Sequence, residues 1–312
     1  MLARSIQNNS FLSSVIYEEL QKQVPHLNKE SQSIGRHSIT VFENQTGALA
    51  EAVRIFNEVS QLARRQPIDT IRCFLYLLDF PKEIDLEKEN ITSGECNTAT
   101  TTFYSLEDKI EVVLWRKEEW QKVFYHELIH AFSIDTIISP QKEAEDRIKQ
   151  HFSHYNNSIR EAYTEILATR LSSKEDLKND SIFIGSQVNK IIYFMESTPL
   201  EKEQLSKETK PDLNHLKGVE YIERFFDNPS KRLDFNTNTS SYYVLKSIYY
   251  WYATHYDLSL LDINNLLDKD FIKKHFYRVL LEGLEKGDYH TWLKEIYFTP
   301  TNLSLRLTYR CL

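Results

Sequence analysis

The sequence predicts an α+β protein that is mostly helical and has a small mixed or antiparallel sheet in its N-terminal half. Every segment with the apolar, β-branched or aromatic pattern of a strand lies before residue 115. From Pro140 onward, apolar residues recur at helical spacing almost throughout. Only 7 glycines among 312 residues leave few tight turns, which suits helices joined by short polar loops.

The composition indicates a folded protein with no nucleic-acid partner. At 41% hydrophobic and 27% charged residues, the chain can bury one substantial core or two modest ones. The net charge is −7, and no run of Lys and Arg interleaves with aromatic residues. The cysteines Cys73, Cys96 and Cys311 are odd in number and lack metal-type spacing, which suits packing roles in a reducing compartment.

The N-terminus has no secretory pattern. Met1 to Ser5 leads into polar Gln7, Asn8 and Asn9 without an apolar core, and no uncharged apolar stretch of about 18 residues follows. We therefore expect a cytoplasmic protein with no membrane partner. Its unleadered, Asn-, Lys- and Tyr-rich character also suggests an effector delivered into a host cell.

The N-terminal elements are predicted in the following order. The first 35 residues are polar and weakly helical, and an amphipathic helix covers residues 46–65. The last two predicted strands are separated by four residues and should form an antiparallel pair. The predicted strands are 38–42, 70–79, 98–104 and 109–114.

The second half is predicted to be helical, with one linker. Residues 198–211 are charged and bounded by prolines, which is typical of a surface excursion between two lobes. We therefore expect an N-terminal extension (1–35), a metal-binding core (36–197) and a helical lobe (198–312). The predicted helices are 141–152, 158–171, 181–196, 211–226, 240–256, 258–268, 270–286 and 289–297.

The stretch His126-Glu127-Leu128-Ile129-His130 has the HExxH pattern of a zinc-binding helix. Histidines four positions apart share one helical face, so both imidazoles can reach one metal while the glutamate lies beside it. Glu118 and Glu119 should lie in the helix's first turn, where acids suit the positive end of the dipole. The apolar stripe, about 100° from the histidines, comprises Trp120, Phe124, Leu128 and Ala131.

Catalytic zinc usually takes three protein ligands, so a third is needed. Glu161 comes 31 positions after His130, on the predicted helix 158–171, and Glu165 follows one turn later. Over about residues 105–171 this pattern resembles the gluzincin metallopeptidases, which include thermolysin, anthrax lethal factor and the botulinum neurotoxin light chains. The resemblance implies a zincin-like core and one Zn²⁺ held by His126, His130 and Glu161. It also implies that Glu165 orients His130 from the outer shell.

A structural role for both glutamates remains open. Ser158 and Glu161 fit the capping-box pattern, and the apolar stripe of their helix puts Glu161 and Glu165 on the opposite, solvated face. Glu165 itself could be the third ligand in place of Glu161. Further candidates for the third ligand are His151, His154 and Asp135.

The motif predicts a zinc metallopeptidase in which Glu127 is the general base and a polypeptide is the substrate. An extended peptide could pair with an edge strand, for which 98–104 is the candidate. Tyr242 is our first choice for the donor that stabilises the oxyanion. The sequence also admits a non-peptidase amide hydrolase, a zinc-binding regulator and a helical interaction protein. The remaining candidate donors are Tyr243, Tyr249, Tyr250, His255, His154 and Tyr155.

Overall fold

The computed structural model divides the chain into two compact units, which we describe separately. Unit 1 comprises residues 1–81 and 96–136, and unit 2 comprises residues 82–95 and 137–312. These boundaries differ from the expected segments 1–35, 36–197 and 198–312. The structure describes residues 2–7, 9, 12–64, 69–85, 93–151, 158–173, 176–197, 216–217, 222, 240–285, 287–298 and 304–305.

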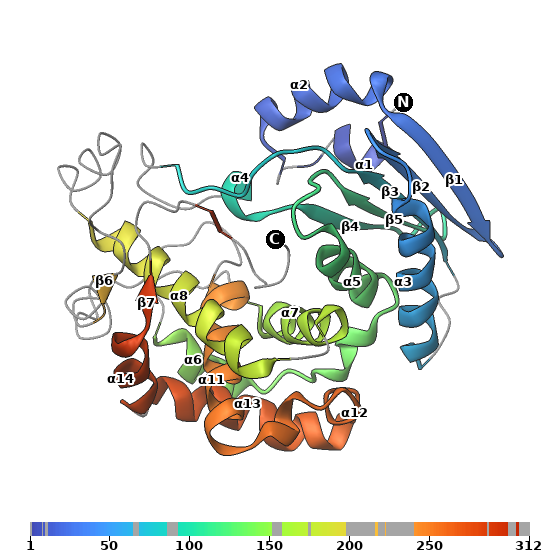
Figure 1. The fold of residues 1–312 in the computed structure, drawn as a ribbon. Coiled ribbons are helices and arrows are strands. Elements are labelled where there is room, and N and C mark those ends of the chain that lie inside the picture. Colours follow the sequence, from blue (N-terminus) through green and yellow to red (C-terminus); the bar gives the residue numbers. More distant parts are fainter. Residues whose placement is uncertain are drawn as a thin grey trace. The chain divides into compact units, whose positions relative to one another are not determined.

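Unit 1 is built around a five-stranded mixed sheet with the strand order β1-β2-β3-β5-β4 (Figure 1). The pairs β1/β2 and β4/β5 are antiparallel, whereas β3 runs parallel to both of its neighbours. The predicted α+β class and antiparallel pair are confirmed. The strands are β1 (Asn28–Ile34), β2 (His37–Glu43), β3 (Thr70–Tyr76), β4 (Ala99–Tyr104) and β5 (Lys109–Leu114).

The edge strand β1 is not predicted by the sequence. Its residues, NKESQSI, are mostly polar and exposed, so they lack the apolar alternation that marks a half-buried strand. A two-residue turn at Gly35 and Arg36 joins β1 to β2, and Gly35 has a φ of 57°. Glycine at the first central position is typical of a primed hairpin turn.

Helices cover both faces of this sheet (Figure 1). The helices α3 (Ala48–Leu62) and α5 (Trp120–Ala131) pack against each other on one face, where α3 contacts β2 and α5 contacts β4 and β5. On the other face lie the short helix α1 (Arg4–Gln7) and the longer α2 (Ser14–Gln23).

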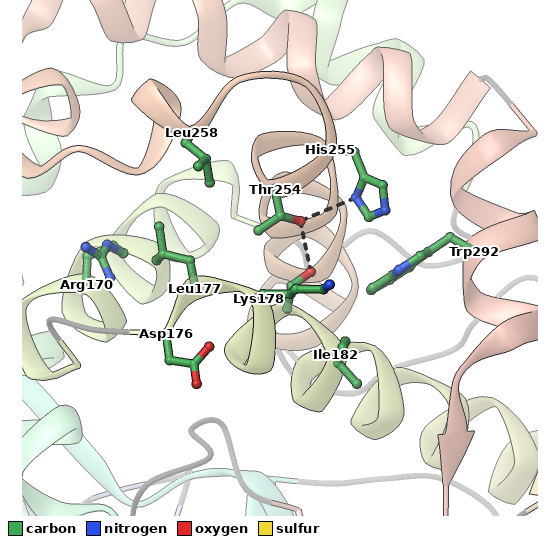
Figure 2. A pocket seen from close by; sticks show the side chains of 10 residues that line it. Arg170, Asp176, Leu177, Lys178, Ile182, Thr254, His255, Leu258 and Trp292 are labelled. Atoms are coloured by element: carbon green, nitrogen blue, oxygen red, sulfur yellow. Dashed lines mark hydrogen bonds between the residues drawn. The ribbon is translucent and has the colours of Figure 1, made fainter.

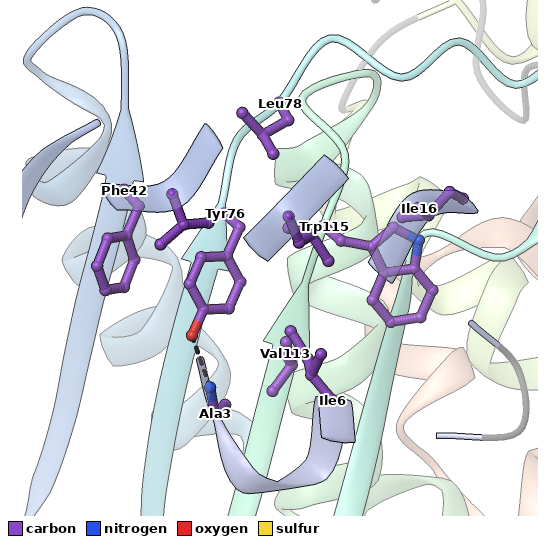
Figure 3. Packing of buried hydrophobic residues seen from close by; sticks show 10 residues of the cluster. Ala3, Ile6, Ile16, Phe42, Tyr76, Leu78, Val113 and Trp115 are labelled. Carbon is purple, nitrogen blue, oxygen red and sulfur yellow. Dashed lines mark hydrogen bonds between the residues drawn. The ribbon is translucent and has the colours of Figure 1, made fainter. Parts of the chain in front are cut away.

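The N-terminal helices are part of the core of unit 1 (Figure 3). Ile6 of α1 and Ile16 of α2 pack in one apolar cluster with sheet residues that include Tyr76 and Val113. The Tyr76 hydroxyl also accepts a hydrogen bond of 2.8 Å from the Ala3 N–H. The described residues before 35 therefore belong to the sheet unit and do not form a separate extension.

Unit 2 is mainly helical, as predicted, but it also contains a short strand pair. Strands β6 (Leu216–Lys217) and β7 (Tyr297–Phe298) are antiparallel, so the expectation of no strand after the HExxH motif was wrong. Two-residue strands are too short to show a period in the sequence. The helices are α6 (Lys142–Lys149), α7 (Ile159–Ser172), α8 (Leu177–Glu196), the π-helix η4 (Ser240–Leu245), α11 (Lys246–Tyr256), the 3₁₀ helix η5 (Leu258–Leu261), α12 (Ile263–Leu266), α13 (Lys269–Glu285) and α14 (Asp288–Glu295).

Three predicted helices differ from the structure, and one of them, 240–256, is divided into the π-helix η4 and α11. The segment 258–268 is split into η5 and α12, and the segment 211–226 contains β6, with most of its other residues outside the described ranges. The expected linker 198–211 also lies outside them. Within the described ranges, no helix combines the length and the apolar composition that crossing a bilayer requires.

Candidate metal centre

The HExxH helix α5 is buried on nearly all sides. It begins at Trp120, after Glu119, whose φ of 56° places it outside the helix, so the expectation of acids in the first turn was wrong. His126 is 6% exposed and Glu127 is 8% exposed. The polar groups of the motif are therefore held in a low-dielectric environment, where an unpaired donor or acceptor would be costly.

The two histidines converge through their Nε2 atoms, which lie 3.1 Å apart. The ring centroids of His126 and His130 are 4.9 Å apart, with an interplanar angle of 72°. Two nitrogens bound tetrahedrally to one zinc, each at about 2.0–2.1 Å, would lie about 3.3 Å from each other. The observed separation therefore suits two ligands of one ion.

Asp135 binds the other ring nitrogen of His130. Its Oδ2 accepts a hydrogen bond of 3.0 Å from Nδ1, and the Asp135 side chain is buried. The chain turns at Ser133, which has a φ of 55°, into the 3₁₀ helix η2 (Ile134–Ile137), and this turn returns Asp135 to the histidine. A proton held on Nδ1 leaves the Nε2 lone pair available to a metal.

Asp135 makes the hydrogen bond to His130 that the family resemblance implies for Glu165. The sequence alone presents Asp135 only as an alternative ligand. The signal available in the sequence is an acid five positions after the second histidine, just beyond the end of the helix.

The Glu127 carboxylate is held by the edge strand β4. Thr101 Oγ1 lies 2.6 Å from Glu127 Oε2, to which it donates a hydrogen bond, and 3.1 Å from the Glu127 carbonyl oxygen. Thr101 therefore contacts both the backbone of α5 and the side chain of Glu127, the candidate catalytic group. The sequence pattern indicates this strand as a peptide-binding edge but does not single out Thr101.

The helix α7 carries Glu161 near its N-terminus. Ser158 is the N-cap, and its hydroxyl accepts a hydrogen bond of 3.3 Å from the Glu161 N–H, as the capping pattern predicts. The Glu161 side chain is half-buried.

Glu165, one turn later on α7, lies in the interior of unit 2. Its Oε1 accepts a hydrogen bond of 3.1 Å from Lys246 Nζ of α11, and the two side chains are 1% and 0% exposed. Residues 162–171 of α7 are all buried. The alternative that both glutamates lie on a solvated face therefore does not hold for Glu165, which is buried, whereas Glu161 is only half-buried.

His126, His130 and Glu161 form a group that could hold a metal ion. One ligand atom from each lies within 4.8 Å of the other two. Two imidazoles and one carboxylate are a donor set found at catalytic zinc, with a fourth position open. Among the alternative ligands, His151 is exposed and His154 lies outside the described residues.

The candidate oxyanion donors have different surroundings. Tyr243 and Tyr249 donate hydrogen bonds of 3.0 and 3.2 Å to backbone carbonyls in the core of unit 2. Tyr250 is fully buried, and this burial raises the pKa of its phenol well above the usual value. Tyr242 on η4 is half-buried, whereas His255 is exposed at the end of α11. Outside the described residues lie His154 and Tyr155.

Compared with known proteins, the chain matches no protein-family model, no curated protein and no solved structure. The interpretation of the site therefore depends on its own residues.

Proposed function

We propose that the protein is a zinc-dependent metallopeptidase with a zincin-like catalytic core. The observation that carries this proposal is the HExxH helix itself. The Nε2 atoms of His126 and His130 are 3.1 Å apart, and the Glu127 carboxylate between them in sequence is fixed by Thr101. These are the elements that zinc-dependent hydrolysis needs: two metal ligands and a positioned base.

His126, His130 and Glu161 would hold the zinc. Two neutral imidazoles and one carboxylate leave a net positive charge on a divalent ion, which keeps it a strong electrophile. When bound there, zinc supplies a Lewis acid that polarises the scissile carbonyl and acidifies a water molecule. Asp135 keeps the proton of His130 on Nδ1 and so keeps Nε2 a ligand.

Glu127 is the general base and then the general acid. Its carboxylate takes a proton from the attacking water and passes it to the leaving amine nitrogen, so the group ends the cycle in its original form. The hydrogen bond from Thr101 to Oε2 restricts rotation of the carboxylate and leaves Oε1 for the proton transfer. Tyr242, which is half-buried, is the proposed donor to the developing oxyanion, since a phenol O–H can donate a hydrogen bond to it.

An extended polypeptide is the proposed substrate. β4 is an edge strand of the five-stranded sheet, with β5 as its neighbour on one side. Its residues are mostly half-buried, and it carries Thr101, which touches the proposed base. A peptide that adds to this edge gains main-chain hydrogen bonds whatever its side chains are.

The test compares wild type, Glu127→Gln and the matched control Glu143→Gln, which changes an exposed glutamate of α6. Each zinc-loaded protein is incubated with a peptide library, and new termini are identified by mass spectrometry. Wild type and Glu143→Gln should cleave. Glu127→Gln should keep its zinc and lose at least about 100-fold of the activity, the low end for one positioned acid–base group.

Two results would overturn the proposal. New termini that persist undiminished in Glu127→Gln would rule out Glu127 as the base. Zinc-loaded wild type that cleaves no peptide would favour a non-peptidase amide hydrolase or a zinc-binding regulator.

A further inference from the structure

Unit 2 contains a pocket with a volume of about 730 Å³ (Figure 2). Its walls come from the end of α7, the start of α8, the end of α11, η5 and α14. This volume lies within the range of about 300–1,000 Å³ that is typical of small-molecule sites. None of its residues belongs to the proposed metal centre.

A buried arginine supplies positive charge to this pocket. Arg170 lines it and is 9% exposed. Its Nε donates to the Leu261 carbonyl at 3.0 Å and its Nη1 to the Ser173 carbonyl at 2.9 Å, so the guanidinium is held in place. Both acceptors are neutral, and no ion pair to Arg170 is found in the described part of the chain. A guanidinium has five N–H groups, and these two bonds leave others for a ligand.

The acid beside Arg170 offsets one of the positive charges of the lining. Asp176 also lines the pocket, but it is the N-cap of α8 and accepts hydrogen bonds from the Asn179 backbone and side chain. Lys178, in the first turn of α8, is an exposed lining residue. One acid and two bases give the lining a formal charge of +1 before any charge on His255.

The rest of the pocket offers apolar and aromatic surface. Ile182 and Leu258 are 43% and 58% exposed, which is a large apolar area to leave in water. Trp292 packs edge-on against His255, with ring centroids 6.1 Å apart. Figure 2 shows these two rings beside each other, on α14 and α11.

We propose that this pocket binds a small carboxylate that carries an aromatic or branched apolar group. The carboxylate pairs with Arg170, whose planar fork matches two oxygens, while Lys178 adds long-range attraction. The apolar group covers Leu258, Ile182 and the Trp292 ring. The same chemistry occurs in a free organic acid and in the C-terminal residue of a peptide.

The test measures calorimetric binding of N-acetylphenylalanine to the full-length protein, with its amide and inorganic phosphate as comparisons. We expect the acid to bind, the amide to bind at least about 10-fold more weakly, and phosphate not to compete at equal concentration. The binding of N-acetyl-Ala-Ala-Phe is then compared with that of phenylpropionate. This comparison distinguishes a peptide C-terminus from a free organic acid as the ligand.

Variants locate the site. Arg170→Gln should weaken binding of the acid about 10- to 100-fold. Since loss of Arg170 could unfold the protein, Lys178→Glu and Leu258→Asn alter exposed positions and should each weaken binding several-fold. The matched control Lys274→Glu, an exposed lysine of α13, should leave binding unchanged.

Several results would overturn the proposal. They are no binding of the acid at about 10 mM, equal binding of acid and amide, and unchanged binding in both Lys178→Glu and Leu258→Asn. Phosphate that displaces the acid at equal concentration would show a plain anion site and would also contradict the proposed ligand class.

Discussion

Thr101 of β4 donates a hydrogen bond of 2.6 Å to the carboxylate of Glu127 on α5. Since Glu127 is 8% exposed, this contact satisfies a nearly buried anion. It also ties the edge strand of the sheet to the helix that carries both histidines. Strand and helix therefore position the proposed base together.

The first prediction concerns this contact. Thr101→Val keeps the shape of the side chain and removes the hydroxyl, so kcat should fall about 10-fold or more while zinc content stays unchanged. Steady-state kinetics and metal analysis measure the two effects. Thr101→Ser restores the hydroxyl and should recover most of the rate. Equal rates for the valine and serine variants would show that the hydrogen bond does not position Glu127.

The second prediction concerns Asp135. Asp135→Asn should weaken zinc binding about 10- to 100-fold, because the neutral amide no longer stabilises the proton on His130 Nδ1. Competition with a coloured chelator gives the affinity. The control Asp270→Asn, at an exposed position of α13, should bind zinc as wild type does. Wild-type affinity in Asp135→Asn would remove this residue from the site.

The third prediction separates the two glutamates of α7. Glu161→Gln should lose most of the zinc affinity with little effect on the free energy of unfolding, since its carboxylate is the proposed ligand. Glu165→Gln should mainly destabilise unit 2, because it removes the charge that pairs with buried Lys246. Zinc titration and urea unfolding measure both. The reverse ordering in zinc affinity would make Glu165 the ligand.

The fourth prediction addresses the Lys246–Glu165 pair itself. Lys246→Met leaves a buried carboxylate without its ammonium partner and should cost about 3–5 kcal/mol of stability. Changing both residues, in Lys246→Met with Glu165→Leu, removes both charges and should recover most of that loss. Urea unfolding of the metal-free proteins gives the values. Purely additive losses in the double variant would mean that the two side chains do not interact energetically.

The fifth prediction is a pH dependence in unit 1. Burial raises the pKa of Glu111, but hydrogen bonds from Lys109 and the Ser5 N–H outweigh burial and place the pKa below 4.5, its usual value. The folded pKa is lower than the unfolded one, so this contribution is present at neutral pH. It should be lost as the pH falls below about 4.5 through the folded pKa.

The variant Glu111→Gln tests this linkage. Its stability should depend less on pH than that of wild type over this acidic range, as measured by urea unfolding at pH 7 and at successively lower values. The exposed Glu143→Gln should keep the wild-type dependence. An unchanged slope in Glu111→Gln would assign the acid sensitivity to other carboxylates.

The local sequence pattern is enough to predict much of the fold and the two histidines of the candidate site. The strands β2, β3, β4 and β5 are predictable because their apolar and β-branched residues cluster over short stretches. His126 and His130 could be placed together because residues four apart share a helical face, whatever surrounds the helix. The Ser158 cap could be predicted for the same reason, since its hydrogen bond spans three residues.

The surroundings of these residues were decided by tertiary structure. Thr101 and Glu127 are 26 positions apart, and Glu165 and Lys246 are 81 apart, so no helical or strand period relates them. The polar segment β1 forms a strand because its backbone pairs with that of β2. This pairing cannot be predicted from the side chains of β1. Glu165 became buried because α11 packs on α7 and supplies a compensating charge. The spacing of apolar residues in the sequence predicts on which face of a helix or strand a residue lies. Tertiary packing decides which other residues contact that face.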